Sequence, residues 1–273
     1  MLDAEAVDPR ARESPTERFE IRFPAHDDGG VDQDEEWCEV AYDGTKRRIR
    51  FHDYAAVYSV PGLYERIFYD ELGCESPQIV CGLLHDELGR ADADSVELRV
   101  LDVGAGNGMV GDELAKLGDG SIVGVDIIPE AAEAAERDRP EVYDDYFVVD
   151  LTDIPPDTRE QLEQRRFNCL TSVAALGFGD MPPRAFAEAY NLVADGGWIA
   201  FNIKEDFLSN EDGNGTGFSS LIRRMLREET LDLLGKRRYR HRLSMSLEPL
   251  HYVAMVARKR QDVPSDWLDE LDD

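Results

Sequence analysis

Lysine and cysteine are scarce in this sequence, and long apolar runs are missing. Only five of its 273 residues are lysine and four are cysteine, and the cysteines form no CxxC pair. That spacing argues against a metal site and predicts reduced thiols in a cytoplasmic protein. No run of 18 or more apolar residues is present, so we expect no transmembrane helix. The first 36 residues carry 12 acids and no apolar stretch, which is unlike a secretory signal peptide.

Basic residues are too few to balance the acids. There are 58 acidic side chains against 30 basic ones, which gives a formal net charge of −28. Such a surface repels nucleic-acid phosphate and acidic membranes, so we expect neither as a partner. It also repels itself, and we hypothesise that the protein is adapted to a cytoplasm with molar salt, where cations screen the charge.

One segment of this acidic chain is basic. Residues 222–242 contain eight bases and three acids. The usual interpretation of such a run is the solvated polar face of a helix or strand. The alternative is a local patch for an anionic small molecule that includes Arg223 and Arg224.

The N-terminal part is predicted to form appendages to a larger domain. Residues 1–18 are acidic with few apolar positions, which indicates a disordered tail. The extension at 19–94 begins with three short β-rich runs, and Asp43-Gly44 between the last two is a hairpin signal. The runs are Phe19–Phe23, Trp37–Tyr42 and Arg48–Phe51. Residues 52–90 have helical spacing and an aromatic stripe, which either packs into the core or forms a lid over a ligand cleft.

Strict alternation of strand and helix patterns begins at residue 97. The predicted strands are Glu97–Val103, Ser121–Asp126, Tyr146–Leu151, Phe167–Ala174 and Trp198–Ile203. The predicted helices between them are Asn107–Leu117, Pro129–Arg137, Asp157–Arg165 and Pro183–Val193. Alternating βα units with apolar strands predict a doubly wound, Rossmann-like parallel sheet that helices cover on both faces.

The pattern changes after the fifth strand. Phe218–Leu234 has helical spacing, and two strands follow at Arg240–Leu247 and His251–Arg258. The connection Glu248–Leu250 is too short for a crossover helix, so these two strands must be antiparallel. The expected α/β fold is therefore a seven-stranded sheet, mostly parallel with an antiparallel C-terminal strand, in a domain that spans 95–260.

The end of the sequence is acidic again. Residues 261–273 contain six acids and no base. We predict an acidic C-terminal tail here. Trp267 and Leu268 are the residues that could tether it.

The stretch Val100-Leu-Asp-Val-Gly-Ala-Gly-Asn-Gly108 carries the strongest functional signal. A buried strand runs into three glycines at alternate positions and then into a helix. Glycine lets a ligand lie against the main chain, and the start of a helix offers free N–H groups. Asp102 lies near the end of the strand, where a carboxylate is costly to bury without a partner, such as an ammonium group or water bound to one.

Two further carboxylates follow on the same edge of the predicted sheet. The second strand ends at Asp126, 20 residues after Gly106, where doubly wound folds place an acid that accepts hydrogen bonds from ribose hydroxyls. The third strand ends near Asp150, which taken alone could also be a turn cap. Such folds bind ligands at the carboxyl ends of their strands, so this edge is the predicted site.

Together these features resemble the class I S-adenosylmethionine-dependent methyltransferases. The matching segments are the E/D-x-G-x-G-x-G motif at Asp102–Gly108, the acid at Asp126, Val-Val-Asp-Leu at 148–151, the Phe-Asn-Cys-Leu-Thr-Ser-Val fourth strand and Ala-Asp-Gly-Gly-Trp-Ile at 194–199. The final antiparallel pair is also a hallmark of that family. More loosely, Val173–Gly177 and Asp180–Pro183 resemble the orphan methyltransferase-like proteins of the Williams–Beuren region.

The resemblance implies S-adenosylmethionine as cofactor and a role for individual residues. The first motif would pack against the methionine portion of the cofactor through Asp102, Gly104, Ala105, Gly106, Asn107 and Gly108. Around the adenosine, Asp126 would hold the ribose hydroxyls and Ile127 would lie on the adenine. Asp150, beside Leu151, would bind the adenine amino group. Ser172 and Val173 would border the sulfonium.

Methyl transfer needs an acceptor held in line with the carbon–sulfur bond, and a neutral acceptor must also lose a proton. The groups near the predicted cleft that could take it are His52, Asp53, Tyr54, Tyr58 and His241, and we single out His52 and Tyr54. The fourth strand is followed by Ala-Ala-Leu-Gly, not the (D/N)-P-P-(Y/F) of nucleic-acid amine methyltransferases, and no Pro-Cys nucleophile occurs. We therefore expect a small-molecule acceptor, methylated on O or N, with the oligomeric state open.

Two other functions stay open at this point. Gly106-Asn-Gly-Met-Val-Gly111 fits the G-x-G-x-x-G of nicotinamide enzymes, although a lone match is weak and leaves Asp102 and Gly104 unexplained. The other alternative is a partner module that binds the cofactor without catalysis, because a fold does not fix a function.

Overall fold

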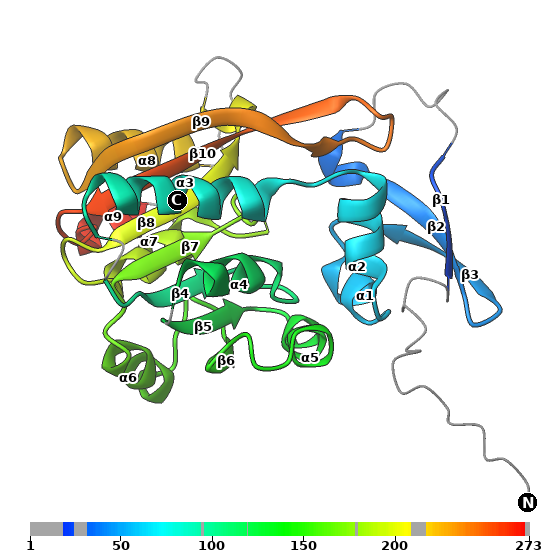
Figure 1. The fold of residues 1–273 in the computed structure, drawn as a ribbon, viewed down its shortest axis with the longest axis horizontal. Helices are drawn as coiled ribbons and strands as arrows, with labels where there is room; N and C mark the ends of the chain where they lie inside the picture. Colours follow the sequence, from blue (N-terminus) through cyan, green and yellow to red (C-terminus); the bar gives the residue numbers. More distant parts are fainter. Residues whose placement is uncertain are drawn as a thin grey trace, which may run out of the picture.

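The computed structural model describes residues 19–24, 32–93, 96–118, 120–177, 180–208 and 217–270. Its centre is a seven-stranded sheet with the order β6-β5-β4-β7-β8-β10-β9 (Figure 1). The strands are β4 (Arg99–Val103), β5 (Ser121–Asp126), β6 (Asp145–Val148), β7 (Cys169–Ser172), β8 (Trp198–Lys204), β9 (Leu231–Leu243) and β10 (Pro249–Lys259). The tail predicted at 1–18 lies outside the described residues.

The directions of the strands confirm the predicted fold class. Strands β4 to β8 pair in parallel, whereas β10 pairs antiparallel with both β8 and β9. Within this sheet β10 is therefore the strand that runs against the others. The turn between β9 and β10 is tight, since the Ser244 N–H donates to the Glu248 carbonyl. So short a connection permits only an antiparallel pair.

The helix predicted over Phe218–Leu234 is wrong in its second half. The helix α8 (Phe218–Arg227) stops early, and β9 begins four residues later. Glu229 has a φ of 55°, and the Thr230 N–H donates to the Met225 carbonyl, which is how helices end through a left-handed residue. The apolar residues beyond that point belong to a strand, whose alternation imitates helical spacing over so few positions.

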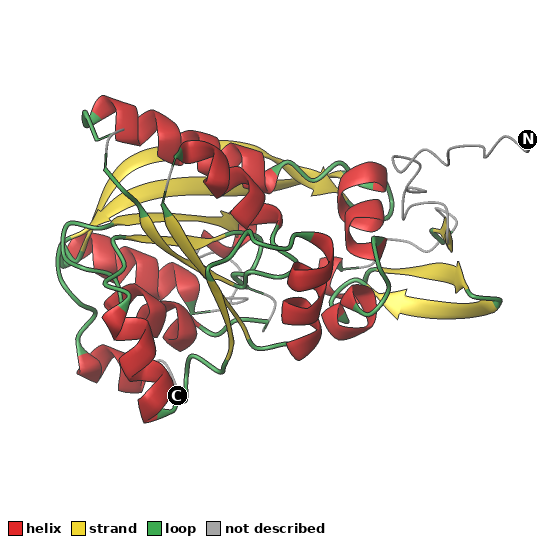
Figure 2. Cartoon of the chain, turned by 60° about the horizontal axis from the view of Figure 1, so that its bottom comes forward, coloured by secondary structure: helices red, strands yellow, loops and turns green. Residues whose placement is uncertain are grey.

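Helices cover both faces of the large sheet (Figure 2). Successive residues of β4 divide between the two faces, because Val100 packs with one group of helices and Leu101 with the other. The first group is α3 (Ser76–Arg90) and α4 (Met109–Leu114), continued by the 3-10 turn η4 (Ala115–Leu117). The second group is α6 (Pro156–Gln164), α7 (Pro183–Asn191), α8 and α9 (Ser265–Glu270). Burial on both faces explains the apolar strands.

The end of the described chain packs into the core. Val263, Trp267 and Leu268 are buried in the same cluster as α7 and α8. The Arg224 guanidinium also lies 4.1 Å from the centroid of the Trp267 ring. The segment that begins at residue 261 is thus tethered through Trp267 and Leu268. Within the described part of the chain, no helix combines the length and the apolar character that a membrane span requires.

A smaller antiparallel sheet, β1-β2-β3, stands beside the large one, at the right of Figure 1. Its strands are β1 (Phe19–Arg22), β2 (Trp37–Tyr42) and β3 (Thr45–Arg50). Asp43 and Gly44 have φ values of 49° and 73°, which confirms the predicted hairpin turn. Glu36 fixes this sheet to the β9–β10 hairpin, because its buried carboxylate accepts hydrogen bonds from Arg242 Nη2 (2.5 Å) and the Met245 N–H (2.6 Å).

Helical turns connect the small sheet to α3. They are α1 (Tyr54–Tyr58), α2 (Leu63–Glu65) and the π-helical turn η3 (Arg66–Glu71). The aromatic stripe predicted here is partly core, since the Phe68 and Phe51 rings pack with centroids 5.5 Å apart. Tyr54, Tyr58 and Tyr64 instead line a cleft at the end of the large sheet. We call α1 and α2 the lid. Although α3 precedes residue 94, it packs on the large sheet.

Candidate active site

The cleft lies at the carboxyl ends of β4, β5, β6 and β7. Three tyrosines of the lid, Tyr54, Tyr58 and Tyr64, form part of its wall. The predicted cofactor residues that line it are Gly104, Asp126, Ile127, Asp150, Leu151 and Val173. The helix α5 (Pro129–Asp138) supports the lid, because Ala131 and Ala134 pack with Tyr58. The cleft therefore occupies the edge at which doubly wound sheets bind their ligands.

The glycine turn after β4 lies beneath the lid, and Gly104 lines the cleft. Gly104 and Gly106 have φ values of 69° and 54°, a region that residues with side chains avoid. A Cβ atom at Gly104 would lie 2.6 Å from the Ala175 Cβ, and one at Gly106 would lie 2.4 Å from Tyr58 Oη. The turn therefore needs glycine at both positions, and the lid rests directly on it.

Asp126 ends β5 in the wall of the cleft. Its Oδ2 accepts a 3.0 Å hydrogen bond from the Gly106 N–H, and its Oδ1 accepts one of 3.1 Å from the Ile128 N–H. Burial raises the pKa of Asp126, and these backbone donors lower it. The carboxylate is thus held in one orientation by the glycine turn. Beside it, Ile127 is 56% exposed although it is apolar, so it offers a hydrophobic surface to a ligand.

Asp150 lies in the wall of the cleft and caps a turn. It lines the cleft, and its Oδ1 accepts hydrogen bonds from the Thr152 N–H (2.8 Å) and the Thr152 hydroxyl (2.7 Å). This turn cap fixes the carboxylate in the cleft wall.

Asp102 lies behind the glycine turn and is only 1% exposed. Thr171 Oγ1 donates to its Oδ1 at 2.6 Å, and Tyr143 Oη donates to its Oδ2 at 2.8 Å. Burial raises the pKa of Asp102 to about 6, while both hydrogen bonds lower it. The partner that a buried carboxylate requires is therefore supplied by two hydroxyls of the protein itself.

The remaining predicted cofactor residues surround the turn. A smaller pocket shares Gly104 and Val173 with the cleft. Its wall also contains Ala105, Gly106 and Asn107. Gly108 is the N-cap of α4, with a φ of 88°. Ser172 is fully buried at the end of β7, and its hydroxyl has no hydrogen-bond partner among the described residues.

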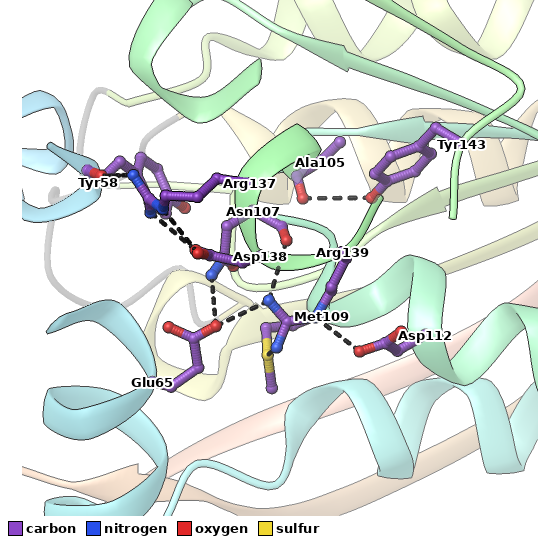
Figure 3. A network of polar contacts seen from close by, with 10 residues as sticks. All are labelled: Tyr58, Glu65, Ala105, Asn107, Met109, Asp112, Arg137, Asp138, Arg139 and Tyr143. Carbon is purple, nitrogen blue, oxygen red and sulfur yellow. Dashed lines mark hydrogen bonds and ion pairs between the residues drawn. The ribbon is translucent and has the colours of Figure 1, made fainter. Parts of the chain in front are cut away.

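Arg139 ties the lid to the glycine turn (Figure 3). Its Nη1 donates to Glu65 Oε1 at 2.7 Å and to the Asn107 carbonyl at 3.0 Å. Its Nε donates to Asp112 at 2.6 Å. Glu65 Oε1 also accepts a 2.8 Å hydrogen bond from Asn107 Nδ2. Because Glu65 belongs to α2, this network holds the lid against the first motif.

A second cavity adjoins the cleft, and we call it the side chamber. It shares Tyr54, Tyr64, Ala174, Ala175 and Asp180 with the cleft. Its own lining includes Gln33, His52, Phe68, Arg242 and Tyr252. His52 Nδ1 lies 2.7 Å from Asp180 Oδ2, so an acid–imidazole pair stands where the two cavities meet.

The groups proposed to take a proton differ in their surroundings. Burial raises the pKa of Tyr54 well above its ordinary value, and the nearby Asp180 carboxylate raises it further. The phenol therefore holds its proton more tightly than an exposed tyrosine does. Burial lowers the pKa of His241 well below its ordinary value, with a contribution from Arg242, and so this imidazole is neutral. His52 pairs with the Asp180 carboxylate in the wall of the side chamber.

Sequence reasoning missed several residues that the structure brings to the site. They are Gln33, Glu65, Arg139, Asp180 and Met181. Asp180 and Met181 stood out only as part of a resembling segment. Glu65 and Arg139 are charged residues without a local pattern that distinguishes them from a solvated surface. In the described ranges, no three His, Cys, Asp or Glu side chains are grouped so that they could hold a metal ion.

The chain is similar to known proteins. The family model described as "Methyltransferase domain" matches residues 77–244. A proposed RNA methyltransferase from Pyrococcus horikoshii is 15% identical over 68% of this chain and 86% of that chain, with a TM-score of 0.49. The magnesium protoporphyrin IX methyltransferase from Synechocystis PCC 6803 with bound SAM is 14% identical over 67% and 79%, with a TM-score of 0.45.

A third structure, the ribosomal protein L11 methylase from Lactobacillus delbrueckii subsp. bulgaricus, is 18% identical over 65% of this chain and 77% of that chain, with a TM-score of 0.42. No curated protein matches the chain. The three structures differ in acceptor, and their likeness to this chain indicates no acceptor for it. The resemblance to the Williams–Beuren-region proteins stays a prediction.

Proposed function

This chain belongs to the methyltransferase domain family, and on that premise we propose that it methylates an oxygen or nitrogen of a small molecule with S-adenosylmethionine. The bound cofactor supplies a methyl group on positively charged sulfur, which is already activated for displacement. The task left to the protein is to hold the acceptor in line with that carbon and, where needed, to receive a proton.

Three features of the cleft support this cofactor. Gly104 lines the cleft without a side chain, so its main chain allows a close approach by the methionine portion. Asp126 ends β5, where an acid accepts hydrogen bonds from ribose hydroxyls. Ile127 provides an exposed apolar surface for the adenine, and Asp150 follows on the same wall for its amino group.

The observation that carries the proposed acceptor is the wall shared by the cleft and the side chamber. A small molecule bound at that wall would reach both the cofactor in the cleft and the polar groups of the side chamber. The net charge of −28 disfavours a nucleic acid. Basic residues within 222–242 also interact with other residues of the chain, since Arg224 lies over Trp267 and Arg238 Nε donates to Glu205. Those contacts count against a patch for an anionic molecule.

Calorimetric titration in high salt tests the cofactor. We expect S-adenosylmethionine and S-adenosylhomocysteine to bind with micromolar Kd, and Asp126→Ala to weaken both at least about tenfold, or 1.4 kcal/mol. Asp144→Ala is the matched control, because Asp144 Oδ2 accepts a 2.8 Å hydrogen bond from the Ile122 N–H at the opposite end of β5. Binding of NADH in place of the adenosyl ligands, or of none of them by folded protein, contradicts the proposal.

A further inference from the structure

The amide of Gln33 stands in the wall of the side chamber with one atom unused. Gln33 is 8% exposed, so its side chain is shielded from bulk water. Its Nε2 donates to Tyr252 Oη at 3.0 Å. Its Oε1 has no hydrogen-bond partner among the described residues. A buried acceptor without a donor is costly, and a bound molecule that brings a donor to this point would remove the cost.

The pair His52 and Asp180 stands on the side of the chamber that borders the cleft. An imidazole that donates its Nδ1–H to a carboxylate carries its lone pair on Nε2, which is the tautomer of a general base. The carboxylate of Asp180, 2.7 Å from Nδ1, also stabilises the imidazolium that forms when the proton arrives. This arrangement suits removal of a proton from an O–H group, whereas a neutral amine attacks with a lone pair it already has.

The rest of the chamber favours the edge of a flat, neutral molecule, because its free volume of about 30 Å³ is too small for a whole ring. Its aromatic lining is Tyr54, Tyr64, Phe68 and Tyr252. Rings of this kind pack best on another planar apolar surface. Arg242 also lines the chamber, but its guanidinium donates to Glu36 and to the Leu243 carbonyl. With that cation engaged and Asp180 at the edge, an anionic acceptor would meet repulsion.

We infer that the side chamber, with a free volume of about 30 Å³, binds the polar edge of the methyl acceptor while the rest of the acceptor extends toward the cleft, and that the acceptor is a neutral planar hydroxyl compound of the phenol or enol class with a second hydrogen-bond donor. The inference rests on the proposed function. The reacting hydroxyl faces His52, and the second donor meets Gln33 Oε1. The acceptor O–H bond breaks and its proton passes to His52. The O–CH3 bond forms as the carbon–sulfur bond breaks, and the electron pair of that bond stays on sulfur.

Binding of simple aromatics tests the class of acceptor. Catechol, resorcinol, hydroquinone, phenol, benzoate and benzylamine are titrated into protein saturated with S-adenosylhomocysteine. We expect the best of the three diols to bind about tenfold more tightly than phenol, and benzoate and benzylamine to bind more weakly still. In Gln33→Leu the advantage of the diol over phenol should vanish. Gln78→Leu, an exposed glutamine on α3 that donates to Glu113, should keep that advantage.

Transfer of labelled methyl from S-adenosylmethionine to the same compounds tests the base. We expect the diol oxygen to be methylated, and His52→Asn and Asp180→Asn to lower kcat about 100-fold while KM changes little. His85→Asn, an exposed histidine on α3, serves as control. If Gln33→Leu does not fold, Gln33→Met replaces it.

Different results would contradict the inferred acceptor and the proposed methyltransferase function. If S-adenosylhomocysteine binds but no diol binds, or if benzylamine or benzoate is the preferred acceptor, the inference about the acceptor is overturned and the proposed function stands. If Gln33→Leu and Gln78→Leu reduce the advantage of the diol over phenol equally, the role of Gln33 is overturned. If S-adenosylhomocysteine itself does not bind, the proposed function fails first.

Discussion

The proposed cofactor side and the proposed acceptor side of this site are built differently. The cofactor side comes mainly from one βαβ unit between Val100 and Asp126, where main-chain angles and one carboxylate define the surface. The acceptor side collects Gln33, His52 and Asp180 from segments far apart in the chain. A cofactor site can therefore be specified by a short local pattern, whereas an acceptor site depends on how distant segments pack.

The largest effect on cofactor affinity should come from adding a side-chain methyl group to the glycine turn. In Gly106→Ala the new Cβ would lie 2.4 Å from Tyr58 Oη at a φ of 54°, so either the turn or the lid must move. We expect affinity for S-adenosylhomocysteine to fall at least about 100-fold, or 2.7 kcal/mol. Gly82→Ala on α3, where a Cβ meets nothing within 4 Å, should bind normally. Equal affinities for both variants in calorimetry would show that the turn is not a tight cradle.

A smaller effect should follow from detaching the lid. Glu65→Ala leaves the Arg139 guanidinium without its 2.7 Å partner on α2, and we expect the free energy of unfolding to fall by about 2 kcal/mol. Urea denaturation measures this change. Glu71→Ala removes a more exposed partner of Arg66 and should cost less than about 1 kcal/mol. If the two losses are alike, the network of Figure 3 does not hold the lid.

Asp102 should make stability depend on pH. Burial raises its pKa to about 6 in the folded protein, above the ordinary value near 3.9. The folded state therefore holds this proton more tightly, and the resulting stability is complete below about pH 4 and is lost as the pH rises through 6. Denaturation curves measure this effect. As the pH rises from 4 to 7, the free energy of unfolding of Asp102→Asn should increase by about 1–2 kcal/mol relative to that of the wild type. Parallel pH curves for the two proteins would contradict this account.

Salt should raise the stability of the whole protein and should have the smallest effect on cofactor binding. Screening of the net charge of −28 should raise the melting temperature steadily between 0.1 M and 2 M KCl, as we propose for a protein adapted to salt. Affinity for S-adenosylhomocysteine should change by less than about twofold once the protein is folded, because the cofactor side is mostly main chain. A melting temperature that is independent of KCl would exclude the salt adaptation.

The same contrast explains what the sequence could predict. The strand Ser121–Asp126 has the predicted bounds, because an apolar run that ends in an acid is a local pattern. The end of α8 was missed because the left-handed φ of Glu229 has no local signature. The contact between His52 and Asp180 spans 128 residues, and no local pattern reports such a pair. The motif identified Asp102, but no local pattern could identify its hydrogen-bond partners Tyr143 and Thr171, which belong to two other segments.

The most direct test of the account is a crystal structure with S-adenosylhomocysteine. We predict its methionine portion along Gly104 and Gly106, its ribose at Asp126, and its sulfur toward the wall that the cleft shares with the side chamber, with Gln33 and His52 untouched by it. S-adenosylhomocysteine lodged against Gln33 and His52 would contradict the division of the site into a cofactor side and an acceptor side.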